Sequence, residues 1–186
     1  MNMSKFTIIL FHLFLILAFF PFGKIVFAVD TNQFILKSSS FTERSIIPKK
    51  FTCDGENVSP ELTWENLPMG TVTLVLICED PDAPGGIWTH WILYNIPPRL
   101  YSIPENMNDQ EELIIQEKIL VGRNDFKKLG YGGPCPPPGK PHRYFFRLFA
   151  LNEKLDLKAG LNRDQLLAAI KENILKEAQL VGLYGH

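Results

Sequence analysis

The run VTLVLIC at residues 72–78 constrains the fold of this chain more than any other feature, because it is almost continuously apolar. A short apolar run rich in β-branched residues is typical of a strand that is buried on both faces. We therefore expect this strand to lie in the interior of a β-rich domain.

Shorter apolar stretches accompany this run, and turns rich in Gly, Pro, Asn and Asp separate them. The candidate strands are residues 33–37, 62–64, 91–95 and 143–151. Residues 99–129 are polar and irregular, and within them only 113–121 suggest a strand.

Helix signals gather near the end of the chain. Asn162 can cap a helix, with Gln165 three residues later, and Glu172 and Lys176 are spaced as a helical ion pair. The apolar stripe of this helix would comprise Leu166, Leu167, Ile170, Ile174 and Ala178. Strands followed by a packed helix predict a mainly β fold of the sandwich type, with peripheral and C-terminal helices.

The first residues have the pattern of a signal peptide. An apolar run at 6–20 follows Lys5, is too short to span a membrane easily, and leads through a Pro-Phe-Gly break to Val26-Phe27-Ala28. We expect cleavage after Ala28, giving a signal peptide at 1–28 and a single domain at 29–186. The protein would be exported, to the periplasm of a Gram-negative bacterium or otherwise secreted. The alternative is an uncleaved membrane anchor.

The composition limits the partners. The 186 residues are 46% hydrophobic, which excludes wholesale disorder, and 19 Lys and Arg face 20 Asp and Glu. A near-neutral chain lacks the basic excess of a nucleic-acid-binding protein, so we expect no nucleic acid partner.

Export changes the interpretation of the three cysteines, because disulfides persist in oxidising compartments. Cys78 closes the buried strand, where a free thiol behaves as a small apolar group, whereas Cys53 and Cys135 lie in turn-rich loops. We therefore predict a Cys53–Cys135 disulfide and a free Cys78.

Two loops carry side chains suited to chemistry. In CEDPDAPGGIWTHW, Asp80 and Asp82 flank a proline, and His90 arrives as the next strand begins. If the flanking strands pair in antiparallel fashion, Asp80 and His90 lie at the same end of the sheet. In GYGGPCPPPGKPHRY, a Gly- and Pro-rich loop leads into a strand on which His142 and Tyr144 share one face.

These side chains suit the binding of a small anion such as phosphate. They comprise two histidines, a carboxylate that can fix a ring tautomer and a tyrosine hydroxyl. The alternative is that these are turn and strand-end residues with no ligand. A hydrolase using His90 or His142 as a general base near Asp80 is a second possibility, but both loops lack serine and a disulfide would silence Cys135. A metal site built from His90, His142 and Asp80 is a third possibility, but the sequence has no close-spaced H-x-x-x-H or C-x-x-C pair, so we expect no metal. Because no convincing nucleophile or metal motif is found, we expect no enzyme activity, and we expect no cofactor.

These motifs resemble the phosphatidylethanolamine-binding protein family, also called Raf kinase inhibitor-like proteins, and are most similar to its bacterial branch. The resemblance rests on DPDAP with W-x-H, on FTCDGENVSPELTW, on GRNDFKKLGYGGPCPPPG with HRY, and on AQLVGLYG. It covers about residues 34–184 and implies a β-sandwich of one larger and one smaller antiparallel-rich sheet, with an anion pocket at one end.

Carried over by the resemblance, the pocket would bind small anions such as phosphate or phospholipid head groups. Its residues would be Asp80, Asp82, Ala83, Pro84, Trp88, His90, Gly133, Pro134, Cys135, Pro136, Pro137, His142 and Tyr144. The chain departs from eukaryotic members by having Cys135 where they have glycine. A protein partner or a homodimer is a further expectation, although an exported protein does not meet a cytosolic kinase.

Overall fold

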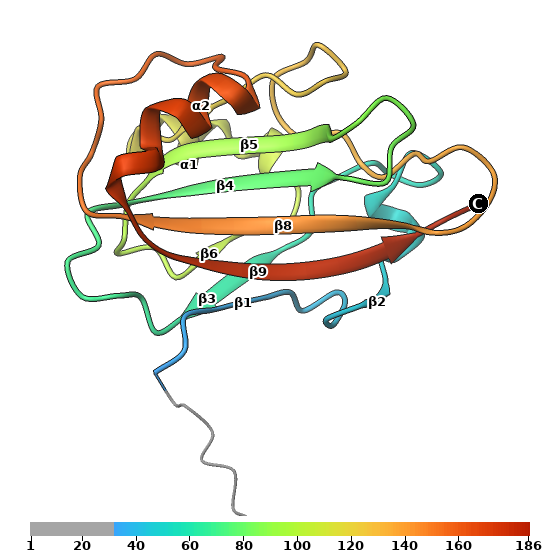
Figure 1. The fold of residues 1–186 in the computed structure, drawn as a ribbon, viewed down its shortest axis with the longest axis horizontal. Helices are drawn as coiled ribbons and strands as arrows, with labels where there is room; N and C mark the ends of the chain where they lie inside the picture. Colours follow the sequence, from blue (N-terminus) through green and yellow to red (C-terminus); the bar gives the residue numbers. More distant parts are fainter. Residues whose placement is uncertain (1–31) are drawn as a thin grey trace, which may run out of the picture. The chain divides into compact units, whose positions relative to one another are not determined.

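The computed structural model describes residues 32–186, and the predicted signal peptide lies outside the described residues. The described chain forms two sheets (Figure 1). The larger sheet has the strand order β2–β9–β8–β4–β5–β7. Its strands are β2 (Ser45–Ile46), β9 (Ile174–Tyr184), β8 (His142–Leu151), β4 (Thr73–Asp80), β5 (Trp88–Ile96) and β7 (Leu120–Val121).

The smaller sheet has the strand order β1–β3–β6. Its strands are β1 (Ile35–Lys37), β3 (Leu62–Glu65) and β6 (Ser102–Ile103). Its strand pairs are antiparallel, and in the larger sheet the short β2 runs parallel to β9 while the other pairs are antiparallel. The mainly β fold with two antiparallel-rich sheets, predicted from the sequence, is therefore confirmed.

The predicted interior strand is also confirmed, because every residue of β4 is buried. Leu74, Leu76 and Cys78 belong to the main apolar core, which both sheets share. Val75 and Ile77 point to the opposite face, where they pack in a second cluster with Leu166 and Ile170 of helix α2 (Arg163–Ile170). Figure 1 shows this helix beside β5 and β4. Layers on both faces explain why the strand is apolar throughout.

The predicted cap of α2 is present, since the Asn162 side chain accepts from the Gln165 amide and the Gln165 side chain accepts from the Asn162 amide. The predicted continuation of the helix through Ile174 and Ala178 is wrong. The helix ends at Ile170, a 3-10 turn η3 (Lys171–Asn173) follows, and residues from Ile174 onward form β9. Glu172 and Lys176 are therefore not a helical pair, and Glu172 lies 3.5 Å from Lys171 instead.

Long-range pairing explains this result. Strand β9 pairs with β8 over almost its whole length, and Ala178, Leu180, Gly182 and Tyr184 are buried at alternate positions. A run that fits a helical stripe locally is held as a strand because it completes the ladder of a neighbouring strand.

The predicted strand at 113–121 is also wrong over most of its length. Residues Glu111–Glu117 form helix α1, and only Leu120–Val121 form a strand, β7. Adjacent Leu113 and Ile114 pack against the core while Ile115 is exposed, which is a helical and not an alternating pattern. Lys118 has a φ of 54°, a left-handed conformation that ends the helix.

The remaining short helices in the described chain are the 3-10 turns η1 (Lys49–Phe51) and η2 (Met107–Asp109). Within residues 32–186, no helix has the length and apolar content that crossing a membrane requires.

Candidate functional site

A cavity of about 240 Å³ lies at the end of the larger sheet where β4 ends and β5 and β8 begin. Strands supply its polar groups, and the two loops singled out in the sequence supply most of its walls. Its lining residues are Asp80, Ala83, Pro84, Gly85, Trp88, His90, Phe126, Cys135, Pro136, Pro137, His142 and Tyr144.

A β-bulge places His90. Between β4 and β5, Cys78 pairs with Trp91 and Glu79 pairs with Thr89, so His90 is the extra residue of β5. Regular alternation would put His90 and Trp91 on opposite faces of the sheet. The bulge allows Trp91 to lie in the main core while His90, its neighbour, lines the cavity on the same side as Tyr144.

The carboxylate of Asp80 is buried and is committed to two partners. Its Oδ1 accepts from the amide of Asp82 at 2.8 Å, and its Oδ2 accepts from Nδ1 of His142 at 2.8 Å. A carboxylate can only accept here, so Nδ1 of His142 carries a hydrogen. A molecule in the cavity therefore meets His142 through Nε2.

His90 is only 2% exposed, and its Nδ1 lies 2.7 Å from the carbonyl oxygen of Gly132. A carbonyl oxygen accepts, so Nδ1 is the protonated nitrogen of the neutral ring. Burial lowers the pKa of His90 despite the opposing effect of the Gly132 carbonyl. His90 is therefore held neutral, and its Nε2 is an acceptor.

The hydroxyl of Tyr144 is buried without a partner in hydrogen-bonding geometry among the described residues. Burial and the nearby Asp80 carboxylate raise the pKa of Tyr144, so the hydroxyl keeps its proton. A buried polar group without a partner is costly, which makes this hydroxyl a donor available to a bound molecule.

The rest of the cavity wall is largely apolar. Trp88 and Phe126 meet edge to face with ring centroids 5.4 Å apart, and Phe126 makes a similar contact with His90. Cys135 also lines the cavity and is joined to Cys53 in a disulfide, while Cys78 is a buried free thiol. The cavity therefore surrounds a few polar atoms with rigid apolar side chains, as small-molecule sites commonly do.

Ten of the thirteen site residues named from the sequence line this cavity, and Asp82, Gly133 and Pro134 do not. Asp82 faces outward, where its carboxylate accepts two hydrogen bonds from the Arg143 guanidinium, at 2.8 and 2.6 Å. Arg143 also lowers the pKa of Asp82. Asp82 thus joins the start of β8 to the β4–β5 loop.

Gly133 and Pro134 belong to the framework behind the wall. The amide of Gly133 donates to Oδ1 of Asn57 at 2.7 Å, so it is not free for a ligand, and a Cβ at this position would lie 2.4 Å from the carbonyl oxygen of Phe51. The carbonyl oxygen of Pro134 accepts from the Cys53 amide. These contacts join the loop to the segment that contains Cys53 and Asn57.

Sequence reasoning missed Gly85 and Phe126. Gly85 lies between Pro84 and Trp88, which the sequence did point to, so the same loop motif could have predicted it. Phe126 lies in the irregular segment 99–129, where no periodicity marks it, and the fold brings it to the cavity.

Comparison with known proteins gives one family. The model of the family described as phosphatidylethanolamine-binding protein matches residues 37–185. A UPF0098 protein of Methanothermobacter thermautotrophicus is 48% identical over 149 residues, which cover 80% of this chain and 97% of the relative.

Two solved structures share the fold. A phosphatidylethanolamine-binding protein homologue from Chlamydia trachomatis, CT736, superposes with a TM-score of 0.75 at 35% identity, covering 84% of this chain and 99% of that one. YbcL of E. coli, described as a member of the mammalian family, gives a TM-score of 0.77 at 30% identity, with coverage of 82% and 98%.

Proposed function

The chain belongs to the phosphatidylethanolamine-binding protein family, and from that premise we propose that its cavity binds a small phosphate-bearing anion, free or as a phospholipid head group. One observation carries the proposal: His90, His142 and Tyr144 line a single cavity, and the Tyr144 hydroxyl there has no hydrogen-bonding partner among residues 32–186. The hydrogen-bond donors and acceptors of these three groups determine which ligand we expect.

Two of these groups donate. The Tyr144 hydroxyl keeps its hydrogen at neutral pH and can donate it, because burial raises its pKa. His142 donates from Nε2 when it is protonated, and Asp80 already holds its Nδ1 hydrogen. A protonated imidazole makes a charge-assisted bond to a phosphate oxygen, and such bonds are about twice as strong as neutral ones.

The third group accepts. Neutral His90 offers Nε2, which repels a fully deprotonated oxygen but accepts the hydrogen of a P–OH group. The cavity therefore suits best the monoanion of free phosphate or of a phosphate monoester, which has both donor and acceptor oxygens. A phospholipid head group is a phosphodiester without that hydrogen, so it would bond to His142 and Tyr144 and leave Nε2 of His90 unpaired. Sulfate has the same shape but no hydrogen at neutral pH, so we expect it to bind more weakly.

Calorimetric titration with phosphate, phosphoethanolamine and sulfate tests this function. We expect phosphate and phosphoethanolamine to bind at one site, and sulfate to bind several-fold more weakly, which corresponds to about 1 kcal/mol. Equal affinity for phosphate and sulfate would contradict the role given to His90, and binding of none of the three would contradict the proposal.

The Asp80–His142 pair favours hydrolysis as a second candidate function, since it has the arrangement of an oriented general base. The groups that could attack are unsuited to it: the raised pKa of Tyr144 keeps it protonated, and Cys135 is in a disulfide. We therefore propose binding without turnover. Release of phosphate from phosphoethanolamine or p-nitrophenyl phosphate by the wild type, abolished in a His142→Ala variant, would establish hydrolysis instead.

Export is a further part of the proposal. It is supported by the apolar segment at 6–20 with its Val-x-Ala site, and by an exposed disulfide of the kind that persists outside the cytosol. N-terminal sequencing of the exported protein should find Val29 as the first residue. A chain that keeps Met1 and stays with the membrane would contradict cleavage.

We also propose that the site influences a protein partner. Ile87 in the β4–β5 loop and its neighbour Trp88, which begins β5 and lines the cavity, are 47% and 37% exposed, and exposed apolar side chains at a pocket suit a contact surface. Cross-linking in the native compartment with and without added phosphate tests this. A partner pattern that does not respond to phosphate or to Trp88→Ala would contradict it.

A further inference from the structure

We propose that the reduced protein binds a thiophilic divalent cation such as Zn²⁺ through Cys53, Cys135 and His186. This site differs in chemistry from the proposed anion cavity, although Cys135 also lines that cavity, and the proposal does not depend on anion binding. In the oxidised protein the two cysteines form the disulfide, so the site would exist only after that bond is opened.

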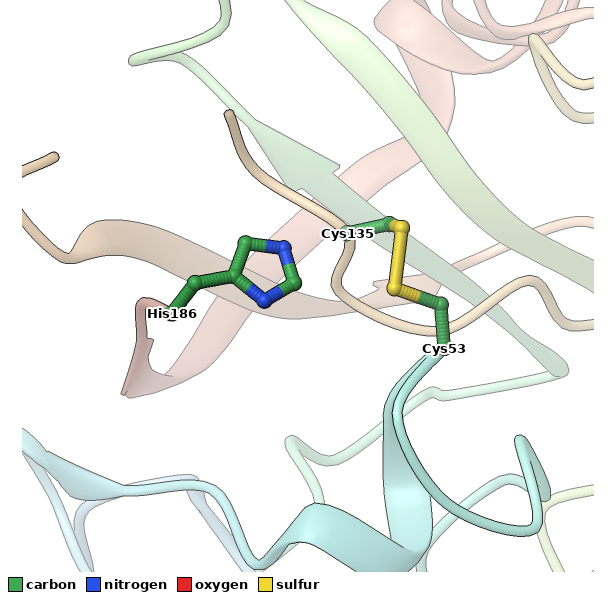
Figure 2. A group of neighbouring side chains, drawn as sticks. All are labelled: Cys53, Cys135 and His186. Carbon is green, nitrogen blue, oxygen red and sulfur yellow. A yellow bond between two sulfur atoms is a disulfide. The ribbon is translucent and has the colours of Figure 1, made fainter. Parts of the chain in front are cut away.

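The three side chains are already gathered at one place on the surface. Their potential ligand atoms, two sulfurs and one ring nitrogen, all lie within 4.8 Å of one another. Figure 2 shows the imidazole of His186 beside the disulfide, on the side of Cys135. Two thiolates and an imidazole are preferred ligands of zinc, and a site with three protein ligands keeps a fourth position for water. All three residues are exposed, so both a reductant and a cation can reach them.

The orientation of His186 supports a ligand role. Its Nδ1 lies 2.9 Å from Oδ2 of Asp54, and the same carboxylate oxygen accepts from the Tyr184 hydroxyl at 2.5 Å. A carboxylate at Nδ1 leaves Nε2 as the free nitrogen. Metal-binding histidines are commonly held in this way, with the other ring nitrogen bonded to a carboxylate.

The two cysteine loops remain neighbours without their covalent bond. The Cys53 amide donates to the Pro134 carbonyl oxygen at 3.0 Å, and the Gly133 amide donates to Asn57 at 2.7 Å. In addition, the buried Tyr131 hydroxyl donates to the carbonyl oxygen of Phe51 at 2.7 Å. Because these bonds connect the same two loops, reduction leaves the thiols close together, and the Cα atoms of the two cysteines are only 5.4 Å apart.

The proposed reaction sequence balances with a dithiol as the reductant. The dithiol gives two electrons and two protons to the Cys53–Cys135 bond, which becomes two thiols, and is itself oxidised to a disulfide. Each thiol then loses its proton to solvent as its sulfur binds the cation. The cation consequently stabilises the reduced form against reoxidation.

Cobalt substitution tests the site directly. The full-length protein is reduced with a phosphine, freed of reductant without oxygen, and titrated with Co²⁺ and then Zn²⁺. We expect equimolar Co²⁺ to produce thiolate-to-cobalt charge-transfer absorption and the intense visible bands of a tetrahedral site, and Zn²⁺ to abolish both. The oxidised protein should show neither. A reduced protein without these bands would overturn the proposal.

Variants separate the three-ligand site from simple binding to two thiols. Asp54→Asn should weaken zinc binding by roughly 10–100-fold, the usual effect of removing a carboxylate that holds a ligating histidine. His186→Ala should weaken it further, while Cys78→Ala, which removes the free cysteine of the described chain, should leave it unchanged. Zinc affinity that is unchanged in both His186→Ala and Asp54→Asn would overturn the role of His186.

Circular dichroism of the reduced protein completes the test. We expect a folded chain whose thermal midpoint rises with zinc, and slower alkylation of Cys53 and Cys135 in the presence of zinc. Binding that occurs only in an unfolded reduced chain would overturn the proposal, because the arrangement of Asp54 and His186 would then be irrelevant.

Discussion

The carboxylate of Asp80 holds the imidazole of His142 through a hydrogen bond of 2.8 Å between Oδ2 and Nδ1. Both side chains are largely buried, with 4% and 12% of their surfaces exposed. The pair joins the end of β4 to the start of β8, and it decides which nitrogen of His142 faces the cavity. The hydrogen-bonding character of the site depends on this relationship.

Replacing Asp80 by Asn should weaken phosphate binding. The amide oxygen of Asn would accept from the Asp82 amide, so its NH₂ group would face Nδ1 of His142 and favour the other tautomer. We expect a loss of about 1 kcal/mol, the difference between a charged and a neutral hydrogen bond. Calorimetry measures it, and an unchanged affinity would contradict the assigned tautomer.

Replacing Tyr144 by Phe should weaken phosphate binding while it stabilises the fold. The hydroxyl has no hydrogen-bonding partner in the described protein, so its removal relieves an unsatisfied buried group, which we expect to raise the free energy of unfolding by about 1 kcal/mol. Tyr101→Phe is the matched control, because Tyr101 is 69% exposed and lies outside the cavity. Urea denaturation gives the stability. A clear destabilisation by Tyr144→Phe would show that the hydroxyl already has a structural partner.

The stability of the protein should fall as the pH drops below about 6.5, in part because of His90. In the unfolded chain a histidine takes up a proton near pH 6.5, whereas burial lowers the pKa of folded His90. Between these two pKa values the unfolded state binds more protons, so the free energy of unfolding decreases as the pH falls.

His90→Asn is the variant that isolates this contribution, because its amide can still donate to the Gly132 carbonyl oxygen while it does not titrate. The slope of stability against pH between about 7 and 5 should be smaller than in the wild type. Denaturation curves at several pH values decide the matter, and identical slopes would mean that His90 is not kept neutral by the fold.

Removing the Cys53–Cys135 disulfide should destabilise the protein by about 4 kcal/mol or less, since the bond links residues separated by 82 positions. Cys53→Ala with Cys135→Ala removes it, and Cys78→Ala provides a control that leaves it intact. Non-reducing peptide mapping establishes the pairing. Two free thiols in the native protein, or a bond that includes Cys78, would be the contrary result.

Local signals in the sequence were sufficient where one neighbourhood decides the structure. Residues 72–78 are apolar on both faces because the core and helix α2 cover both faces of β4, and Asn162 with Gln165 forms a cap that needs no distant partner. The same spacing argument failed after Ile170, because Ala178 fits a helical stripe but also the alternation that β8 requires. Only the neighbouring strand distinguishes the two.

The candidate site, like the fold, could be predicted from the sequence only in part. The sequence motifs were enough to predict that Asp80, His142 and Tyr144 lie close together, because strand direction and period-2 alternation determine where these side chains lie. The position of His90 depends on a bulge in the β4–β5 ladder, and the alternating pattern carries no sign of it. The outward turn of Asp82 depends on Arg143, which period-2 alternation places on the opposite face from His142.

Titration of phosphoethanolamine into four proteins at about pH 6 and pH 8 tests most directly whether the cavity binds a phosphate anion through His142 and Tyr144. The wild type and Tyr101→Phe should bind equally, and more tightly at the lower pH. His142→Ala should lose about 1.5–3 kcal/mol of binding free energy at the lower pH, and Tyr144→Phe about 0.5–1.5 kcal/mol at both. Equal affinities in all four proteins would contradict the claim and place the ligand elsewhere.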